Sequence, residues 1–243
     1  MRYLATVAYD GTNYVGWQSQ TKGQSVQQEI ESALSQILNS PTKIYGSGRT
    51  DAGVHANGQS FHFDTNKEIK DLFKFAYSLN SIMSGDIYIS NIEKVADNFN
   101  ARYDVKSKKY IYWINTGKYD PFKRGYMYQL LRPLDIERMQ EGLKMFIGEH
   151  NFMNFTSKEE DQANFVRNIY NAELIIKKDV IGLSFEGNGF MRYMVRMLVG
   201  TLIEVGLGKL DVSDIKKIME SKDRKVVSYK APACGLYLEK VMY

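Results

Sequence analysis

The chain has 243 residues, of which 44% are hydrophobic and 25% charged, a composition typical of one large globular domain or two small ones. The formal net charge of +4 permits an anionic partner without requiring one. A single cysteine excludes an intrachain disulfide. The N-terminus carries no signal peptide and no apolar run is long enough to span a bilayer, so we expect a cytoplasmic protein without a membrane partner.

The first half of the sequence predicts a β-α-β-β-α-β order. Alternating apolar residues indicate the strands, and the pair Ser25 and Gln28 forms a capping-box pattern ahead of the first helix. The predicted elements are strand 3–9, helix 26–38, strands 43–47 and 59–63, helix 69–77 and strand 86–95. This order is the ferredoxin-like signature.

The second half repeats the order of elements without repeating residues. Asp135 is expected to cap its first helix. The predicted elements are strand 109–115, a helix from 136 to 147, strands 166–177 and 180–186, helix 190–205, an extra helix 214–219 and strand 236–242. Two small basic clusters, Lys106/Lys108/Lys109 and Lys222/Arg224/Lys225, are interpreted as solvated surface.

We therefore predict an α+β fold of two ferredoxin-like subdomains, residues 1–105 and 106–243, which share one catalytic domain. The two halves are expected to form one extended antiparallel sheet with helices on one face and the catalytic cleft on the other. An open sheet face flanked by loops is a surface on which RNA-binding folds commonly hold their ligand.

The outstanding segment is Gly46-Ser47-Gly48-Arg49-Thr50-Asp51-Ala52-Gly53, in which glycines flank an arginine and a carboxylate. Glycine allows a backbone and a ligand to approach closely. Local chemistry alone favours a tight loop in which Asp51 caps a turn and pairs with Arg49. A dinucleotide-binding interpretation fails because Asp51 occupies the position where that motif needs its third glycine.

Three further segments carry candidate functional residues. Residues 9–18 predict a turn followed by a buried Trp17. On strand 109–115, alternation places Tyr110 and Tyr112 on one face, either in the core or as a stacking platform. In helix 190–205, Arg192 and Arg196 lie one turn apart among apolar residues and need an anion or a carboxylate as partner.

The sequence offers little for a metal site. His55 and His62 are seven residues apart on a predicted strand, which places them on opposite faces. We therefore expect no metal ion.

These segments together resemble the tRNA pseudouridine synthase A (TruA) family. The matches follow the family order and extend over nearly the whole chain. They are Tyr9-Asp10-Gly11-Thr12 with Gly16-Trp17-Gln18, residues 48–56, Phe99-x-Ala101-Arg102 with Tyr110-x-Tyr112, residues 148–152, Gly189-Phe190-Met191 with Met194-Val195-Arg196, and Ala231-Pro232-Ala233-x-Gly235-Leu236. Asn100 and Asn164 depart from the common family pattern, where His and Thr are frequent.

The resemblance implies an isomerase that converts uridine to pseudouridine at positions 38, 39 and 40 of the tRNA anticodon stem-loop. It assigns the essential carboxylate to Asp51, acting on a flipped-out uridine. By the same resemblance, substrate is bound by Tyr110, which stacks on the base, Arg49, which helps displace it, Arg196, which keeps the carboxylate ionised, and also Arg102 and the apolar Leu236. It further implies a homodimer, with no cofactor and no metal.

Two other functions compete with this interpretation. A non-catalytic RNA-binding protein or RNA chaperone could use the same fold. A carboxylate-dependent nucleoside or glycoside hydrolase would need a second carboxylate as general acid, and Asp51 is the only acidic residue of its run.

Overall fold

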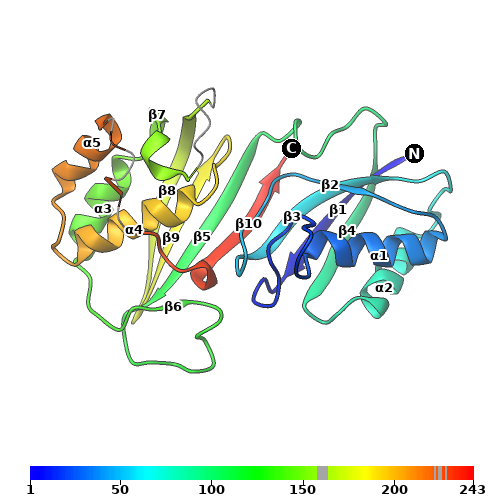
Figure 1. The fold of residues 1–243 in the computed structure, drawn as a ribbon, viewed down its shortest axis with the longest axis horizontal. Helices are drawn as coiled ribbons and strands as arrows, with labels where there is room; N and C mark the ends of the chain where they lie inside the picture. Colours follow the sequence, from blue (N-terminus) through cyan, green and yellow to red (C-terminus); the bar gives the residue numbers. More distant parts are fainter. Residues whose placement is uncertain (158–163, 222, 224–225, 228) are drawn as a thin grey trace. The chain divides into compact units, whose positions relative to one another are not determined.

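A computed structural model describes residues 1–157, 164–221, 223, 226–227 and 229–243 (Figure 1). The contacts between residues divide the chain into two compact units. Unit 1 comprises Met1–Lys106 and Tyr237–Tyr243, and unit 2 comprises Ser107–Leu236. The last seven residues, expected with the second half, thus belong by their contacts to unit 1. Of the second basic cluster, Lys222, Arg224 and Lys225 all lie outside the described residues.

Unit 1 contains the predicted β-α-β-β-α-β order. Its elements are β1 (Arg2–Tyr9), α1 (Val26–Leu38), β2 (Ile44–Gly46), β3 (His55–Asp64), α2 (Leu72–Ile82), β4 (Ile87–Val95) and most of β10 (Leu236–Met242). β1 lies between β4 and β3 and is antiparallel to both, and β2 is antiparallel to β3. The order β4-β1-β3-β2 is that of a ferredoxin-like sheet, which confirms the prediction for this unit.

Helix α1 follows directly from its sequence pattern. The side chain of Ser25 accepts from the backbone N–H of Gln28, and Gln28 returns the bond, so the predicted capping box is confirmed. Ile30 and Leu34, one turn apart, are fully buried. The helix ends at Asn39, which takes the left-handed conformation at φ 49°. Helices α1 and α2 contact one another within the unit (Figure 1).

Strand β3 is longer than its alternating pattern indicates. The prediction began at Gln59, whereas the strand begins at His55. The added residues form backbone pairs on both sides: Ala56 pairs with Tyr9 of β1, and His55 pairs in parallel with Tyr237 of β10. Sequence alternation is weak over 55–58 because the segment contains Asn57 and Gly58. The early start of β3 brings the strand directly against the end of the glycine-rich run.

The strands of unit 2 follow the order β5-β9-β8-β7, each antiparallel to the next, and belong to the same ten-stranded, mostly antiparallel sheet, which confirms the predicted single sheet. Its elements are β5 (Ser107–Asn115), β6 (Tyr128–Gln129), α3 (Ile136–Lys144), β7 (Gly148–Asn151), the 3-10 helix η1 (Met153–Phe155), β8 (Val166–Lys177), β9 (Val180–Gly187), α4 (Met194–Gly206), α5 (Val212–Glu220) and the 3-10 helix η2 (Ala233–Gly235). Asp135 caps α3, as predicted. The mixed α+β class is confirmed.

Helix α4 begins four residues later than predicted. The apolar spacing extended back to Phe190, but Tyr193 takes a left-handed conformation at φ 63° and the helix starts at Met194. Arg192 therefore lies in the turn before the helix and Arg196 inside it, so the predicted placement of both arginines on one helical face is wrong. Within the described residues no helix is long and apolar enough to cross a bilayer.

Candidate active site

Asp51 lies in the loop between β2 and β3, where backbone contacts hold it on one side. Asp51 forms an isolated antiparallel bridge with Gly16, and the N–H of Trp17 donates to the carbonyl of Thr50 at 3.1 Å. The N–H of Val54 donates to the carbonyl of Asp51 itself, also at 3.1 Å. These main-chain contacts fix the backbone of the loop, and Asp51 itself is half-buried.

The bridge to Gly16 requires glycine. Gly16 has φ +110°, a conformation that residues with a Cβ rarely adopt. A Cβ at this position would lie 2.6 Å from the carbonyl oxygen of Thr50. The glycine therefore serves the close approach of residues 16–17 to the segment that carries Asp51.

A buried hydrogen bond supports the residue before Asp51. The hydroxyls of Thr50 and Tyr9 are 2.8 Å apart, and both residues are buried. Tyr9 is the last residue of β1. A side-chain hydrogen bond therefore joins the loop to β1, in addition to the backbone contacts with Gly16 and Trp17.

The start of the loop is held by Gln59, a fully buried side chain of β3. Its Oε1 accepts from the hydroxyl of Ser47 at 2.6 Å, and its Nε2 donates to the carbonyl of Gly48 at 2.9 Å. Because the oxygen and the nitrogen of this buried amide each bond to a loop residue, they fix the positions of Ser47 and Gly48. No feature of the sequence pointed to Gln59.

The end of the loop contacts the turn that follows β1. A Cβ on Gly11 would lie 2.0 Å from the carbonyl oxygen of Val54, so the two backbones touch. The buried His55 has its Nδ1 3.1 Å from the N–H nitrogen of Gly11 and 3.1 Å from Oδ1 of Asp10. A neutral Nδ1 accepts from Gly11, and a protonated one donates to Asp10. In either state the imidazole joins the turn to β3.

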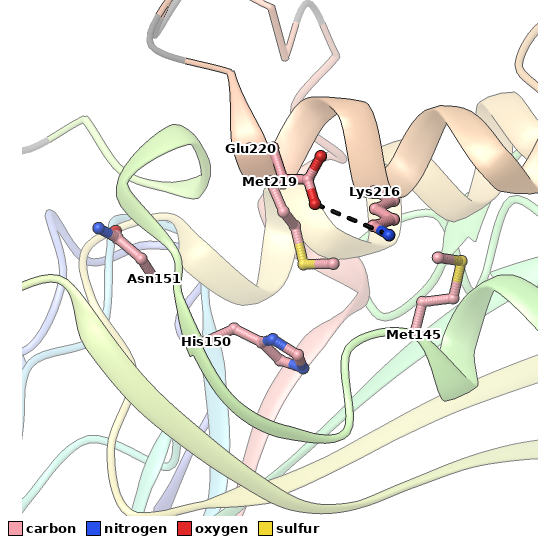
Figure 2. Close-up of a pocket in the computed structure, with 6 residues that line it drawn as sticks. All are labelled: Met145, His150, Asn151, Lys216, Met219 and Glu220. Atoms are coloured by element: carbon pink, nitrogen blue, oxygen red, sulfur yellow. Dashed lines mark ion pairs between the residues drawn. The ribbon is translucent and has the colours of Figure 1, made fainter.

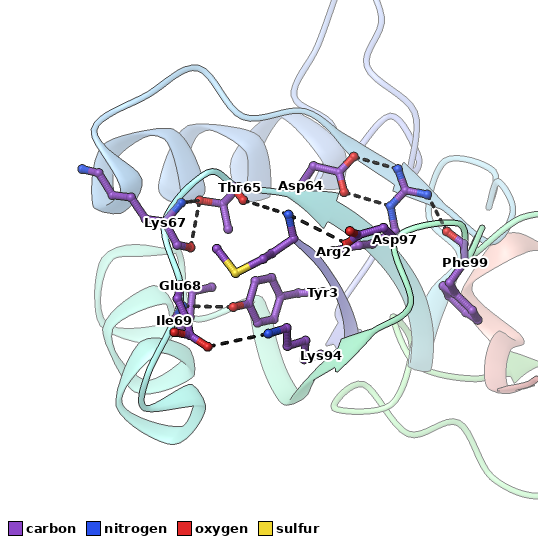
Figure 3. A network of polar contacts seen from close by, with 11 residues as sticks. Arg2, Tyr3, Asp64, Thr65, Lys67, Glu68, Ile69, Lys94, Asp97 and Phe99 are labelled. Atoms are coloured by element: carbon purple, nitrogen blue, oxygen red, sulfur yellow. Dashed lines mark hydrogen bonds and ion pairs between the residues drawn. The ribbon is translucent and has the colours of Figure 1, made fainter.

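Arg102, expected to bind substrate, is exposed in a turn that three side chains of unit 1 anchor. The guanidinium of Arg2, itself paired with Asp64 at 2.7 Å, donates to the carbonyl of Phe99 at 2.6 Å (Figure 3). The N–H of Ala101 donates to Nδ1 of the buried His62 at 3.1 Å. The hydroxyl of Tyr243 donates to the carbonyl of the same alanine at 2.9 Å.

In unit 2, Tyr110 and Tyr112 of β5 are both buried, but their surroundings differ. Tyr112 is a core residue: its hydroxyl donates to the carbonyl of Pro232 at 2.8 Å, and burial raises the pKa of its phenol well above the usual value. The ring of Tyr110 lies edge-on to Phe190, with 5.2 Å between centroids. Tyr110 is therefore held in place by the Gly189-Phe190-Met191 segment of the family pattern.

Arg196 is buried at the first turn of α4, where it is fixed by its neighbours. Its Nε donates to the carbonyl of Ala231 at 2.7 Å, and the N–H of Ala231 donates back to the carbonyl of Arg196 at 3.0 Å. Its guanidinium also stands 5.3 Å from the ring centre of Tyr193. The segment that follows Ala231 leads through η2 to the buried Leu236.

A separate hollow is lined by residues of unit 2 alone. It has a volume of about 420 Å³ and lies in unit 2 between β7, the end of α3 and α5 (Figure 2). Its lining residues are Met145, His150, Asn151, Lys216, Met219 and Glu220. It contains none of the residues expected to bind substrate.

The six expected site residues are thus divided between the units. Asp51 and Arg49 share one loop of unit 1, with Arg49 exposed, and Arg102 lies in a second loop of the same unit. Tyr110, Arg196 and Leu236 belong to unit 2. Sequence reasoning missed Tyr9, Gln59 and His55 as supports of the Asp51 loop. The turn residues at 10–16 indicated the segment that contacts the Asp51 loop, but they did not indicate the contacts made by these three side chains.

Comparison with known proteins identifies the family. A family model described as tRNA pseudouridine synthase matches residues 5–104 and 143–243. A tRNA pseudouridine synthase A from Staphylococcus aureus is 42% identical over 99% of this chain and 90% of its own length. A protein of the same name from an Exiguobacterium species is 44% identical over 100% of this chain and 98% of its own.

A solved chain from a Cbf5-Nop10-Gar1 complex is more distant. It is 12% identical, with 82% of this chain and 54% of that chain covered and a TM-score of 0.35, and we base neither fold nor function on it. The family match and the two relatives suffice: the chain belongs to the tRNA pseudouridine synthases, which are isomerases.

Proposed function

We propose that this enzyme isomerises uridine to pseudouridine in the tRNA anticodon stem-loop, at positions 38, 39 and 40, with Asp51 as the catalytic carboxylate. The observation that carries the proposal is the support of the Asp51 loop: backbone pairing with Gly16 and Trp17 on one side and buried bonds from Tyr9 and Gln59 on the other. A group that must meet a reacting atom needs such fixed placement.

The reaction breaks the bond between N1 of uracil and C1′ of the ribose, turns the base and joins C5 to C1′. C5 loses a proton and N1 gains one, so the product has the mass of the substrate. Asp51 acts as a nucleophile at C1′ or C6, or as the base that removes the 2′ proton. Each route needs an ionised carboxylate in contact with the nucleoside.

The other assigned residues bind the flipped nucleotide. A base inside a stem must leave its stack, at a cost of a few kcal/mol. In our proposal Tyr110 stacks on the extruded base, Arg49 helps to displace it, and Leu236 supplies apolar contact. Stacking on an aromatic ring offsets part of the unstacking cost.

The two arginines supply positive charge. Arg196 favours the ionised form of the Asp51 carboxylate, as a nearby guanidinium does, and Arg102 contacts the RNA backbone. Residues from both halves of the sequence thus serve one catalytic domain. We further propose, on the family resemblance, that the enzyme is a cytoplasmic homodimer.

The experiment is to treat unmodified tRNA with the purified enzyme, map pseudouridine at each uridine and look for released uracil. Pseudouridine at positions 38–40 without free uracil supports the proposal. Pseudouridine confined to other positions contradicts the site assignment. Free uracil or an abasic product indicates the competing hydrolase. Sedimentation of the same sample tests the homodimer.

A further inference from the structure

The loop between β5 and β6, residues 116–127 of unit 2, exposes aromatic rings among cations. Phe122 is 88% exposed, Tyr119 54% and Tyr126 47%. The same loop carries Lys118, Lys123 and Arg124 against the single carboxylate of Asp120, so its net charge is +2. We name this segment the aromatic loop. None of the six expected site residues lies in it.

The aromatic loop is ordered by hydrogen bonds at its base. The side chain of Asn115, buried at the end of β5, donates to the carbonyl of Lys118 and to Oε1 of Gln129, both at 2.7 Å, and accepts from the N–H of Gly117 at 3.0 Å. Oε1 of Gln129 also accepts from the N–H of Asp120 at 3.1 Å. One buried amide and its partner thus fix the first half of the loop.

A tight turn then places Phe122 at the surface. The carboxylate of Asp120 accepts from the N–H of Phe122 at 3.0 Å and pairs with Lys123 at 3.1 Å, and its hydrogen bond with Lys123 lowers the pKa of this carboxyl. Nη1 of Arg124 donates to the carbonyl of Pro121 at 2.7 Å. The backbone that presents the ring is therefore set before any ligand binds, which reduces the entropy lost on binding.

An exposed apolar ring is ordinary when it stands alone, but several rings among cations have the chemistry of a nucleic-acid contact. Aromatic rings stack on unpaired bases, and lysine or arginine side chains neutralise the adjoining phosphates. An anionic membrane or an acidic protein would also bind the positive charge of the loop. The substrate of this family is tRNA, so RNA is the polyanion that the enzyme must hold.

We propose that the aromatic loop binds the tRNA substrate, with Phe122 stacked on an unpaired base and Lys118 and Arg124 on neighbouring phosphates. Tyr110 lies near the middle of β5, five residues before its last residue Asn115, so about 16 Å along the strand separates it from the start of the loop at roughly 3.3 Å per residue. The loop therefore contacts RNA beside the target nucleotide, not the target itself. This inference depends on tRNA as substrate and is independent of the role of Asp51.

The test compares binding of unmodified tRNA to the full-length protein and to Phe122→Ala, Phe122→Trp and Phe73→Ala. Phe73, 82% exposed on α2 of unit 1, is the matched control. We expect Phe122→Ala to weaken binding about 5- to 150-fold, the range of one lost stacking contact, while Phe122→Trp stays close to wild type. Phe73→Ala should bind as wild type does.

Salt dependence tests the cations separately. Lys118→Gln combined with Arg124→Gln should lower the slope of log affinity against log salt by about 1 to 2, because each lost phosphate contact contributes roughly 0.7 to 0.9. Affinity in Phe122→Ala reports on the loop, whereas the single-turnover rate of Asp51→Asn at saturating tRNA reports on the catalytic role of Asp51. Failure of the loop proposal would therefore appear as an unchanged affinity, and failure of the catalytic proposal as an unchanged rate.

Two results would overturn the proposal. One is unchanged tRNA affinity in Phe122→Ala together with an unchanged salt slope in the double variant. The other is a change in the sedimenting mass of Phe122→Ala, because the ring would then be a contact between copies of the chain.

Discussion

The hydroxyls of Thr50 and Tyr9 form a buried hydrogen bond of 2.8 Å between the residue before Asp51 and the last residue of β1. Since β1 pairs with β3 on one side and β4 on the other, the bond joins the loop to an inner strand of the unit 1 sheet. The bond thus supports the loop that carries Asp51 at the residue directly before it.

Replacing Tyr9 with Phe should loosen this connection without opening a cavity. We expect the free energy of unfolding to fall by about 1 kcal/mol, the usual net value of a buried neutral hydrogen bond. If the transition state of the reaction is destabilised by the same free energy relative to the bound substrate, the single-turnover rate of pseudouridine formation falls about fivefold. Denaturant unfolding and a rate measurement at saturating tRNA give both numbers.

Tyr3→Phe is the control for this variant. The hydroxyl of Tyr3 accepts from the N–H of Ile69 at 3.0 Å, away from the Asp51 loop (Figure 3). It should lose similar stability and keep the wild-type rate. Equal rate losses in both variants would mean that the Tyr9 bond serves only the fold.

Gly16→Ala should disturb the placement of Asp51 more strongly. The new Cβ would meet the carbonyl oxygen of Thr50 at 2.6 Å, and the φ of +110° would itself be strained. We expect a stability loss of about 1 to 3 kcal/mol and a rate loss of roughly 10- to 100-fold, since small displacements of a reacting group are costly.

Gly85→Ala provides the comparison, because a Cβ there would have no heavy atom within 4 Å. It should change neither stability nor rate appreciably. A Gly16→Ala enzyme with the wild-type rate would contradict the positioning role that we assign to the bridge between Gly16 and Asp51.

His62 should make unit 1 less stable in mild acid. Burial, together with the positive charge of Arg2, lowers the pKa of His62 below the usual 6.5. The unfolded chain therefore binds this proton more readily, so the free energy of unfolding decreases as the pH falls from about 6.5 through the folded pKa. Protonation also removes the acceptor for the N–H of Ala101.

His62→Gln removes the titration and leaves a side-chain acceptor. Its stability should fall less than that of wild type between pH 7 and pH 5, as measured by denaturant unfolding at each pH. The other two histidines are present in both proteins, so their contributions cancel. Asp64, whose pKa is lowered by Arg2, titrates in more acidic solution. Parallel pH profiles for the two proteins would contradict the assignment.

Much of unit 1 could be predicted from sequence because its signals are local. The capping box at Ser25 and the apolar spacing of α1 depend on residues three and four apart. The first residues of β3 and of α4 could not be predicted from such local patterns. The first residues of β3 are fixed by strand pairing with β1 and β10, and the start of α4 by the left-handed backbone of Tyr193.

For the candidate site, the sequence indicated the residues of the motif but not their supports. Gly16 and Trp17 were visible as a turn and a buried ring, yet their pairing with Thr50 and Asp51 joins segments more than thirty residues apart. The sequence did not indicate a role for Gln59, because a glutamine in a strand is expected to face solvent. In the structure its amide is fully buried against Ser47 and Gly48.

The catalytic role of Asp51 is tested most directly by Asp51→Asn, assayed for pseudouridine in unmodified tRNA under single-turnover conditions. The amide is nearly isosteric but cannot act as a nucleophile or base, and it leaves the backbone bridge to Gly16 and the hydrogen bond from the N–H of Val54 in place. We predict that the variant folds, binds tRNA with an affinity close to wild type and forms no pseudouridine. Pseudouridine formation by Asp51→Asn at the wild-type rate would contradict the account.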